Sequence, residues 1–243
     1  MKTRRYIRAA GFGLAAVFLA AAAVYGQFSL ARRSPVKRPS VAEGAFAAFG
    51  AFRSLAAEVV WFRAGRLQEE GRFTELAQLA RALTLSEPHT PEVWSYAAWN
   101  LAYNVSVMMP EPAERWRWVY TAMRLLRDEG LKLNPGAPEL YRELAWLFEF
   151  KLGLSTDAAQ PYYRERWREI VEDVALRGAW AELGMDPAIM TAMEKKLSLS
   201  DRTDPFYSAV YFAELGLQHA KGADRAFLEE IVRQSLRLHS RML

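Results

Sequence analysis

The spacing of helix-breaking residues in the first half of this 243-residue chain constrains its fold more than any other feature. A helical pattern over residues 56–70 meets Gly71, which can adopt the positive φ that closes a helix. A second helical pattern, over residues 74–86, stops before Pro88 because the residue preceding a proline is disfavoured in the helical region. Pro91 can begin the next helix, since the first helical position does not need its N–H. The stretch therefore predicts helix, turn, helix, break and helix.

This order of elements resembles the tetratricopeptide repeat (TPR), a helix pair with small and large apolar residues at fixed positions. Gly71 and Pro88 are 17 residues apart, as in the family. The resemblance places Ala64 at the small position where the two helices approach and Phe73 at a packing position. Leu76 departs from the family, which usually has alanine there.

The pattern recurs in two further helix pairs. Trp94 and Ala98 occupy the large and small positions of a helix that begins at Pro91, and Tyr141 and Ala145 occupy the same positions over residues 138–152. The resemblance implies that all four side chains belong to the core.

The second repeat is longer than the family allows. Pro91 and Pro135 are 44 residues apart, whereas the family has about 31. The closing helix is expected over residues 118–133. The extra residues include Met108 to Pro112, so we expect a lengthened hairpin loop there.

The expected fold is all-α: a TPR-like solenoid of antiparallel helix pairs, preceded by one transmembrane helix. Strand signals, such as a sustained two-residue alternation, are nearly missing. The expected parts are a membrane anchor (1–28), a linker (29–41), TPR-like repeats (42–153) and degenerate C-terminal helical repeats (154–243). The C-terminal helices are expected over residues 158–177, 187–197, 205–220 and 224–239.

The N-terminal region predicts a membrane helix. Residues 9–26 carry no charge and follow a basic segment, and 18 helical residues span about 27 Å, close to the hydrocarbon thickness. The alternative is a cleaved signal peptide ending near Ala21-Ala22-Ala23. We favour an uncleaved anchor, because a signal peptide has an apolar region of only about 7–15 residues.

Basic residues flank this segment on both sides, so the positive-inside rule does not determine its orientation. We expect a single-pass membrane protein whose short N-terminal tail stays inside and whose folded part lies on the extracytoplasmic side. Cysteine is absent, so disulfides give no information about the redox compartment.

The net charge of +4 does not indicate nucleic-acid binding. Residues 1–38 hold eight of the 32 basic residues and no acidic residue, which leaves 24 basic and 28 acidic residues in the remainder. The basic excess therefore belongs to the flanks of the membrane segment, where it meets anionic headgroups. No basic face remains to contact phosphates.

After the linker, Phe46, Phe49 and Phe52 share one face of a predicted helix. This helix is interpreted either as a juxtamembrane helix on the bilayer or as a capping helix on the first repeat. We favour the capping helix.

The sequence lacks the motifs of an enzyme. His89, His219 and His239 are scattered, and the zinc-protease, nucleophile-elbow and phosphate-loop motifs are absent. Adjacent acidic residues such as Glu69 and Glu70 point apart on a helix. We expect no catalytic site, no bound metal and no cofactor.

The resemblance implies instead that a protein or peptide partner binds in a groove lined by the first helix of each pair. The implied contact residues are Ser95, Trp99 and Tyr103 in the second repeat, and Arg142, Trp146 and Glu149 in the third.

Asn100 and Asn104 lie beside that face, four residues apart, and their amides could bind a peptide backbone or a terminal carboxylate. The alternative for each of these groove residues is packing against a neighbouring helix. A second candidate is Trp116-Arg117-Trp118, which either lies exposed at the long loop or packs at the start of a helix.

The sequence therefore predicts a membrane-anchored TPR-like scaffold or adaptor. Substitution of Trp99 and Arg142 together should weaken partner binding without changing the fold. One alternative is a structural component of an envelope assembly, which a broad apolar surface over residues 158–197 would favour. The other is an enzyme of unrecognised type.

Overall fold

The computed structural model describes residues 63, 66–67, 69–154 and 157–241. The expected membrane segment, the linker and the Phe46, Phe49 and Phe52 face lie outside these residues. Within the described part, no helix is both long and apolar enough to cross a membrane.

The all-α prediction is confirmed for the described residues, which form helices and no strand. Three α-helices continue directly into π-helical turns. The elements are α3 (Phe73–Ser86), α4 (Pro91–Trp99), η1 (Asn100–Val105), η2 (Ser106–Met108), α5 (Pro112–Arg124), η3 (Leu125–Gly130), α6 (Leu131–Leu133), α7 (Pro138–Trp146), η4 (Leu147–Leu154), α8 (Gln160–Arg177), η5 (Trp180–Leu183), α9 (Pro187–Leu197), α10 (Pro205–Leu217) and α11 (Gly222–His239).

Local signals determine most helix ends. Gly71 adopts a φ of +69°, and the Arg72 N–H donates to the Leu67 carbonyl at 2.9 Å, as expected for a left-handed helix end. Proline is the first residue of α4, α5, α7, α9 and α10. The Asp186 side chain caps α9 by accepting from the Ala188 N–H at 2.7 Å. The predicted bounds of α9 are confirmed.

The lengthened hairpin loop expected around Met108 to Pro112 is wrong. Only residues 109–111 separate η2 from α5, and the closing helix begins at Pro112 rather than Trp118. The extra residues lie in the helices themselves, which contain the π-helical segments η1 and η3. A π-helix bonds i to i+5 and takes more residues per turn, so it absorbs extra residues without a longer loop.

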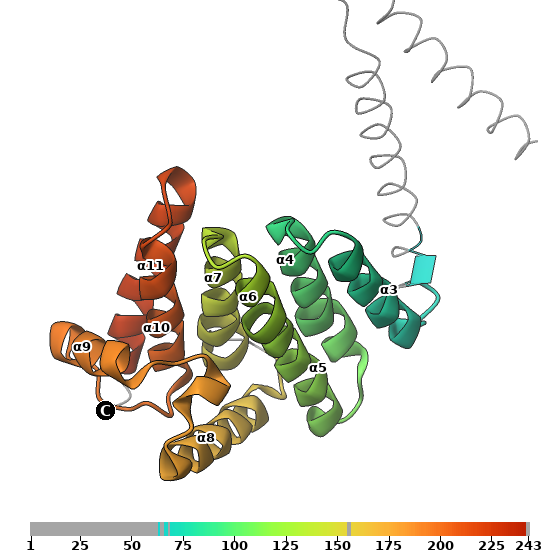
Figure 1. Ribbon diagram of the computed structural model, residues 1–243. Helices are drawn as coiled ribbons and strands as arrows, with labels where there is room; N and C mark the ends of the chain where they lie inside the picture. The colour runs from blue at the N-terminus through green and yellow to red at the C-terminus, as the bar shows by residue number, and fades with distance from the viewer. Residues whose placement is uncertain (1–62, 64–65, 68, 155–156, 242–243) are drawn as a thin grey trace, which may run out of the picture. The chain divides into compact units, whose positions relative to one another are not determined.

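Figure 1 shows α3, α4, α5, α7, α10 and α11 side by side, with α9 next to α10 at one end of the row and α8 below the row, where it packs against α5 and η4. Helix α7 lies at the centre of this row and packs against α4, α10 and α11. Its position between α4 on one side and α10 and α11 on the other determines which of its side chains remain exposed.

Three of the four core positions expected on α4 and α7 are buried, and the side chains of Ala64 and Phe73 lie outside the described residues. Trp94, Ala98 and Ala145 are fully buried, and the Trp94 indole donates to the Pro88 carbonyl at 2.9 Å. Tyr141 is only half-buried, because its ring lies at the helix surface against His219. Helix α4 thus packs its large aromatic residue in the core.

Candidate functional site

Five aromatic side chains contact one another in a continuous aromatic strip. They are Trp99 on α4, Tyr103 on η1, Trp146 on α7, Phe150 on η4 and Phe227 on α11. The ring centroids of Trp99 and Tyr103 are 6.0 Å apart, and those of Tyr103 and Phe150 are 6.5 Å apart. Phe150 stacks on Trp146 at 4.8 Å with the planes 4° apart, and Trp146 contacts Phe227 at 5.8 Å. The strip therefore joins α4 and η1 to the C-terminal helix α11.

Much of the aromatic strip faces solvent. Trp99, Phe150 and Phe227 are 43%, 38% and 42% exposed, while Tyr103 and Trp146 are half-buried. Single exposed apolar residues are normal on a protein surface, but large rings in mutual contact form one apolar patch. Such a patch is typical of an interaction surface.

The local sequence explains the two aromatic pairs that form most of the aromatic strip. Trp99 and Tyr103 are four residues apart, as are Trp146 and Phe150, so each pair shares a helix face. In each pair the first residue ends an α-helix and the second lies in the following π-helix. Because α4 packs beside α7, the two pairs meet. π-Helical turns inside α-helices occur frequently at functional sites.

Two buried polar atoms near the strip have no hydrogen-bond partner among the described residues: Ser95 Oγ and Glu143 Oε1. Burial raises the pKa of Glu143 to about 7, although the charge of Arg142 opposes this shift. Burial, followed by the nearby Glu143 charge, raises the pKa of Tyr103 above its usual range. The strip thus has unsatisfied polar groups beside it.

The three groove residues expected from the third repeat all contact α11. The Arg142 guanidinium forms an ion pair with Asp224, and Trp146 lies against Phe227. Glu149 is buried and accepts a hydrogen bond from Ser235 Oγ at 3.2 Å. The C-terminal helix of the same chain therefore covers part of this face of α7.

The two asparagines bond along their own helix. Asn104 Nδ2 donates to Asn100 Oδ1 at 3.3 Å, and Asn100 Nδ2 donates to the Tyr96 hydroxyl at 3.0 Å. Asn100 is buried and Asn104 is half-buried. Of the two amides, only that of Asn104 reaches the surface.

A buried ionic network packs against Tyr103 of the aromatic strip. Lys151 Nζ lies 5.2 Å from the Tyr103 ring centroid and 3.0 Å from Asp157 Oδ2. Asp157 also accepts from Arg115 Nη1 at 3.0 Å and from the Tyr163 hydroxyl at 2.9 Å. Burial raises the pKa of Asp157, but hydrogen bonds from the Ala159 backbone N–H, Lys151 and Tyr163, together with the Lys151 charge, outweigh it and lower the pKa to about 2. The network joins η4 to α5 and α8.

The second candidate, Trp116 to Trp118, packs rather than projects. Trp116 is buried and stacks on Tyr120 at 5.3 Å and on Tyr163 at 6.1 Å, and Trp118 is half-buried. These contacts favour the packing interpretation.

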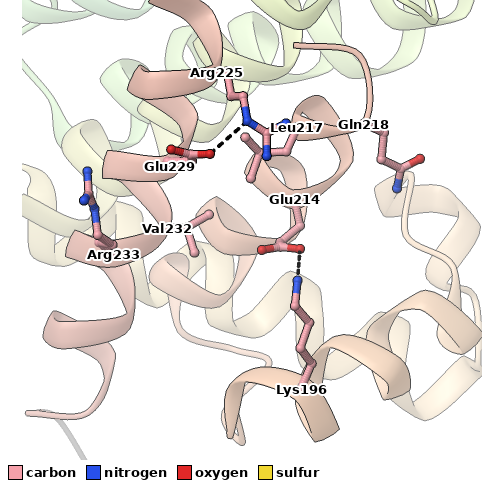
Figure 2. Close-up of a pocket in the computed structure, with 8 residues that line it drawn as sticks. All are labelled: Lys196, Glu214, Leu217, Gln218, Arg225, Glu229, Val232 and Arg233. Carbon is pink, nitrogen blue, oxygen red and sulfur yellow. Dashed lines mark hydrogen bonds and ion pairs between the residues drawn. The ribbon is translucent and has the colours of Figure 1, made fainter. Parts of the chain in front are cut away.

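A cavity of about 530 Å³ lies between α9, α10 and α11. Figure 2 shows Lys196 pointing toward Glu214 and Arg225 toward Glu229, and these ion pairs measure 2.8 Å and 3.0 Å. Arg233, which also lines the cavity, pairs with Glu230 outside it. The charges of the cavity are thus compensated within the protein.

A second cavity, of about 350 Å³, lies at the start of α8 and α10. Its arginines pair with acidic residues: Arg164 with Asp204 at 3.5 Å, and Arg168 with Glu165 at 2.5 Å. Asp204 also contacts the buried His239 Nδ1 at 2.7 Å. No group of three or more metal-ligating side chains occurs among the described residues.

No protein-family model, no curated protein and no solved structure matches this chain. The geometry of the aromatic strip is therefore the basis for assigning a function. Sequence reasoning found Trp99, Tyr103 and Trp146 but missed Phe150, Phe227 and Glu143. Phe150 could have been found from its spacing of four residues after Trp146.

Proposed function

We propose that this chain is a membrane-anchored adaptor with a TPR-like helical solenoid, and that it binds a segment of a partner protein on the aromatic strip. The observation that carries the proposal is the unbroken contact from Trp99 to Phe227, with three of its five rings exposed. Burial of such rings is a main source of binding energy at protein interfaces, where tryptophan and tyrosine are enriched.

The shape of the strip favours a polypeptide as the bound partner. The strip extends across three neighbouring helices and is not enclosed in a cavity, whereas small-molecule sites are concave and bury most of their ligand. A peptide segment can contact rings in succession along such a surface.

The N-terminal region supports a location at the membrane. In this proposal the apolar segment over residues 9–26 anchors the chain, and the linker over residues 29–41 holds the helical part on the extracytoplasmic side. The adaptor would then bring its partner to the membrane surface. The acidic excess outside the first 38 residues argues against nucleic acid as that partner.

The test is a pull-down with the detergent-solubilised full-length chain, comparing wild type with Trp99→Ala. Trp99 is preferred to Arg142, because removing Arg142 also breaks its ion pair with Asp224. Tyr162→Ala is the matched control, since Tyr162 is a similarly exposed aromatic on α8. A partner retained by wild type and Tyr162→Ala, but depleted by Trp99→Ala, supports the proposal once the purified partner shows the same pattern.

Partners retained equally by all three proteins would contradict the proposal. That outcome would favour the alternative, a structural component of an envelope assembly that binds through another surface. In residues 158–197 the exposed large apolar side chains are Tyr162 and Leu176, near opposite ends of α8, and Ile189 on α9. Tyr162 and Leu176 are 14 residues apart on α8, or about 21 Å along its axis, so these side chains do not form one patch. The aromatic strip is therefore the better candidate.

A further inference from the structure

We infer that the segment bound by the aromatic strip presents a lysine or arginine side chain to Glu143. The inference rests on the proposed function and adds the chemistry of the partner to it. It starts from the one acidic side chain beside the strip that has an unpartnered buried oxygen.

Glu143 lies on the same face of its helix as the aromatic strip. It precedes Trp146 by three residues and Phe150 by seven, which are the spacings of one helix face. Its charge also acts on the Tyr103 hydroxyl of the neighbouring helix. The carboxylate therefore lies at the seam where the two aromatic pairs meet.

Among the described residues, the basic side chains close to Glu143 and the aromatic strip are already paired. Arg142, the nearest basic residue along the chain, is paired with Asp224, and the buried Lys151 is paired with Asp157. Glu143 Oε1 accepts no hydrogen bond from any described residue. A buried carboxylate without a donor costs free energy, and a cation brought by a partner would remove that cost.

The surrounding rings favour the same ligand. Trp146 and Phe150 share the helix face of Glu143, and Tyr103 contacts Phe150 with its ring. A cation within about 6 Å of such a ring is attracted to its face. An anionic side chain would be repelled by Glu143. An uncharged segment could offer only neutral donors, whose hydrogen bonds to a carboxylate are weaker than those of a cation. A basic side chain among apolar neighbours therefore complements this surface best.

The experiment is a selection from a library of random dodecapeptides displayed on phage, with the immobilised full-length chain in detergent. It compares wild type with Glu143→Gln, Trp99→Ala and Glu92→Gln, an exposed acidic control on α4. Circular dichroism checks that all four proteins fold alike. We expect wild type and Glu92→Gln to enrich peptides with lysine or arginine among apolar residues. We expect these peptides to bind Glu143→Gln about tenfold more weakly.

Each other outcome contradicts either the cation inference alone or both the cation inference and the adaptor function. Peptides that require Trp99, but show no basic preference or bind Glu143→Gln equally well, would overturn the cation inference and leave the adaptor function standing. If Trp99→Ala retains the same peptides as wild type, or if nothing is enriched over empty beads, both proposals fail. Binding of the chain to anionic vesicles through Trp99, without peptide enrichment, would also overturn both in favour of a lipid surface.

Discussion

The Arg142 guanidinium on α7 forms an ion pair with the Asp224 carboxylate in the first turn of α11, and its central carbon lies 5.7 Å from the Phe227 ring centroid. A side chain expected to contact a partner thus holds the C-terminal helix of its own chain. The aromatic strip is composed of residues from α4, α7 and their π-helical extensions and from the C-terminal helix α11.

Replacing Arg142 should loosen α11. We expect Arg142→Ala to lower the free energy of unfolding by about 1 kcal/mol, through loss of a partly exposed ion pair and a cation–π contact. Hydrogen exchange should accelerate over residues 222–239. Arg225→Ala is the control, because the Arg225–Glu229 pair lies within α11 and is exposed. If both variants changed exchange equally, the contact between α7 and α11 would not depend on Arg142.

Glu149 should make stability depend on pH. Burial raises its pKa to about 7, while the Ser235 hydrogen bond opposes the shift and the Glu230 charge adds to it. The folded state therefore favours the protonated acid. This contribution is fully present below a pH of about 4.5, the ordinary pKa, and is lost as the pH rises to about 7.

Glu149→Gln removes the cost of the buried charge above that range. We expect the variant to be more stable than wild type by about 1–2 kcal/mol at pH 8, with the difference vanishing near pH 4.5. Urea unfolding of the full-length chain at both pH values measures this difference. Glu92→Gln, at an exposed position, should change little at either pH. A pH-independent effect of Glu149→Gln would show that the charge of Glu149 is not the cause.

Gly216 permits close packing of three helices. A Cβ at this position of α10 would lie 2.7 Å from Tyr141 Cβ on α7 and 3.0 Å from Leu228 Cδ1 on α11. We expect Gly216→Ala to destabilise the fold by about 1–3 kcal/mol, because overpacking outweighs the better helix propensity of alanine. Thermal unfolding measures the loss. Gly136→Ala, whose Cβ meets no atom within 4 Å, should be nearly neutral, and equal effects of both variants would rule out the steric cause.

Sequence reasoning succeeded where a few neighbouring residues determine the structure. Gly71 and Pro91 mark helix ends because φ preferences act on the residue itself. The helix at residues 187–197 was predicted from the Asp186 cap for the same reason. The loop expected near Met108 was wrong, because repeat length alone does not distinguish a longer loop from extra residues in π-helical turns.

The aromatic strip was predictable in part. Trp99, Tyr103 and Trp146 followed from positions carried over by the TPR resemblance. Phe227 lies on α11, far along the chain, and no local pattern relates it to Trp146. The sequence does not distinguish Glu143 from other acidic residues on helices. Only the packing of α4 against α7 shows that one of its oxygens is buried.

The sequence by itself determined the helical class of the folded part and the ends of most of its helices, because capping residues and proline act over one or two turns. Only the tertiary structure decided that α11 covers part of α7, that Glu149 is buried, and that the rings from Trp99 to Phe227 meet. These features depend on contacts between helices far apart in the chain. Burial and the pKa shifts that follow from it are properties of that packing, and the spacing of residues along the sequence does not encode them.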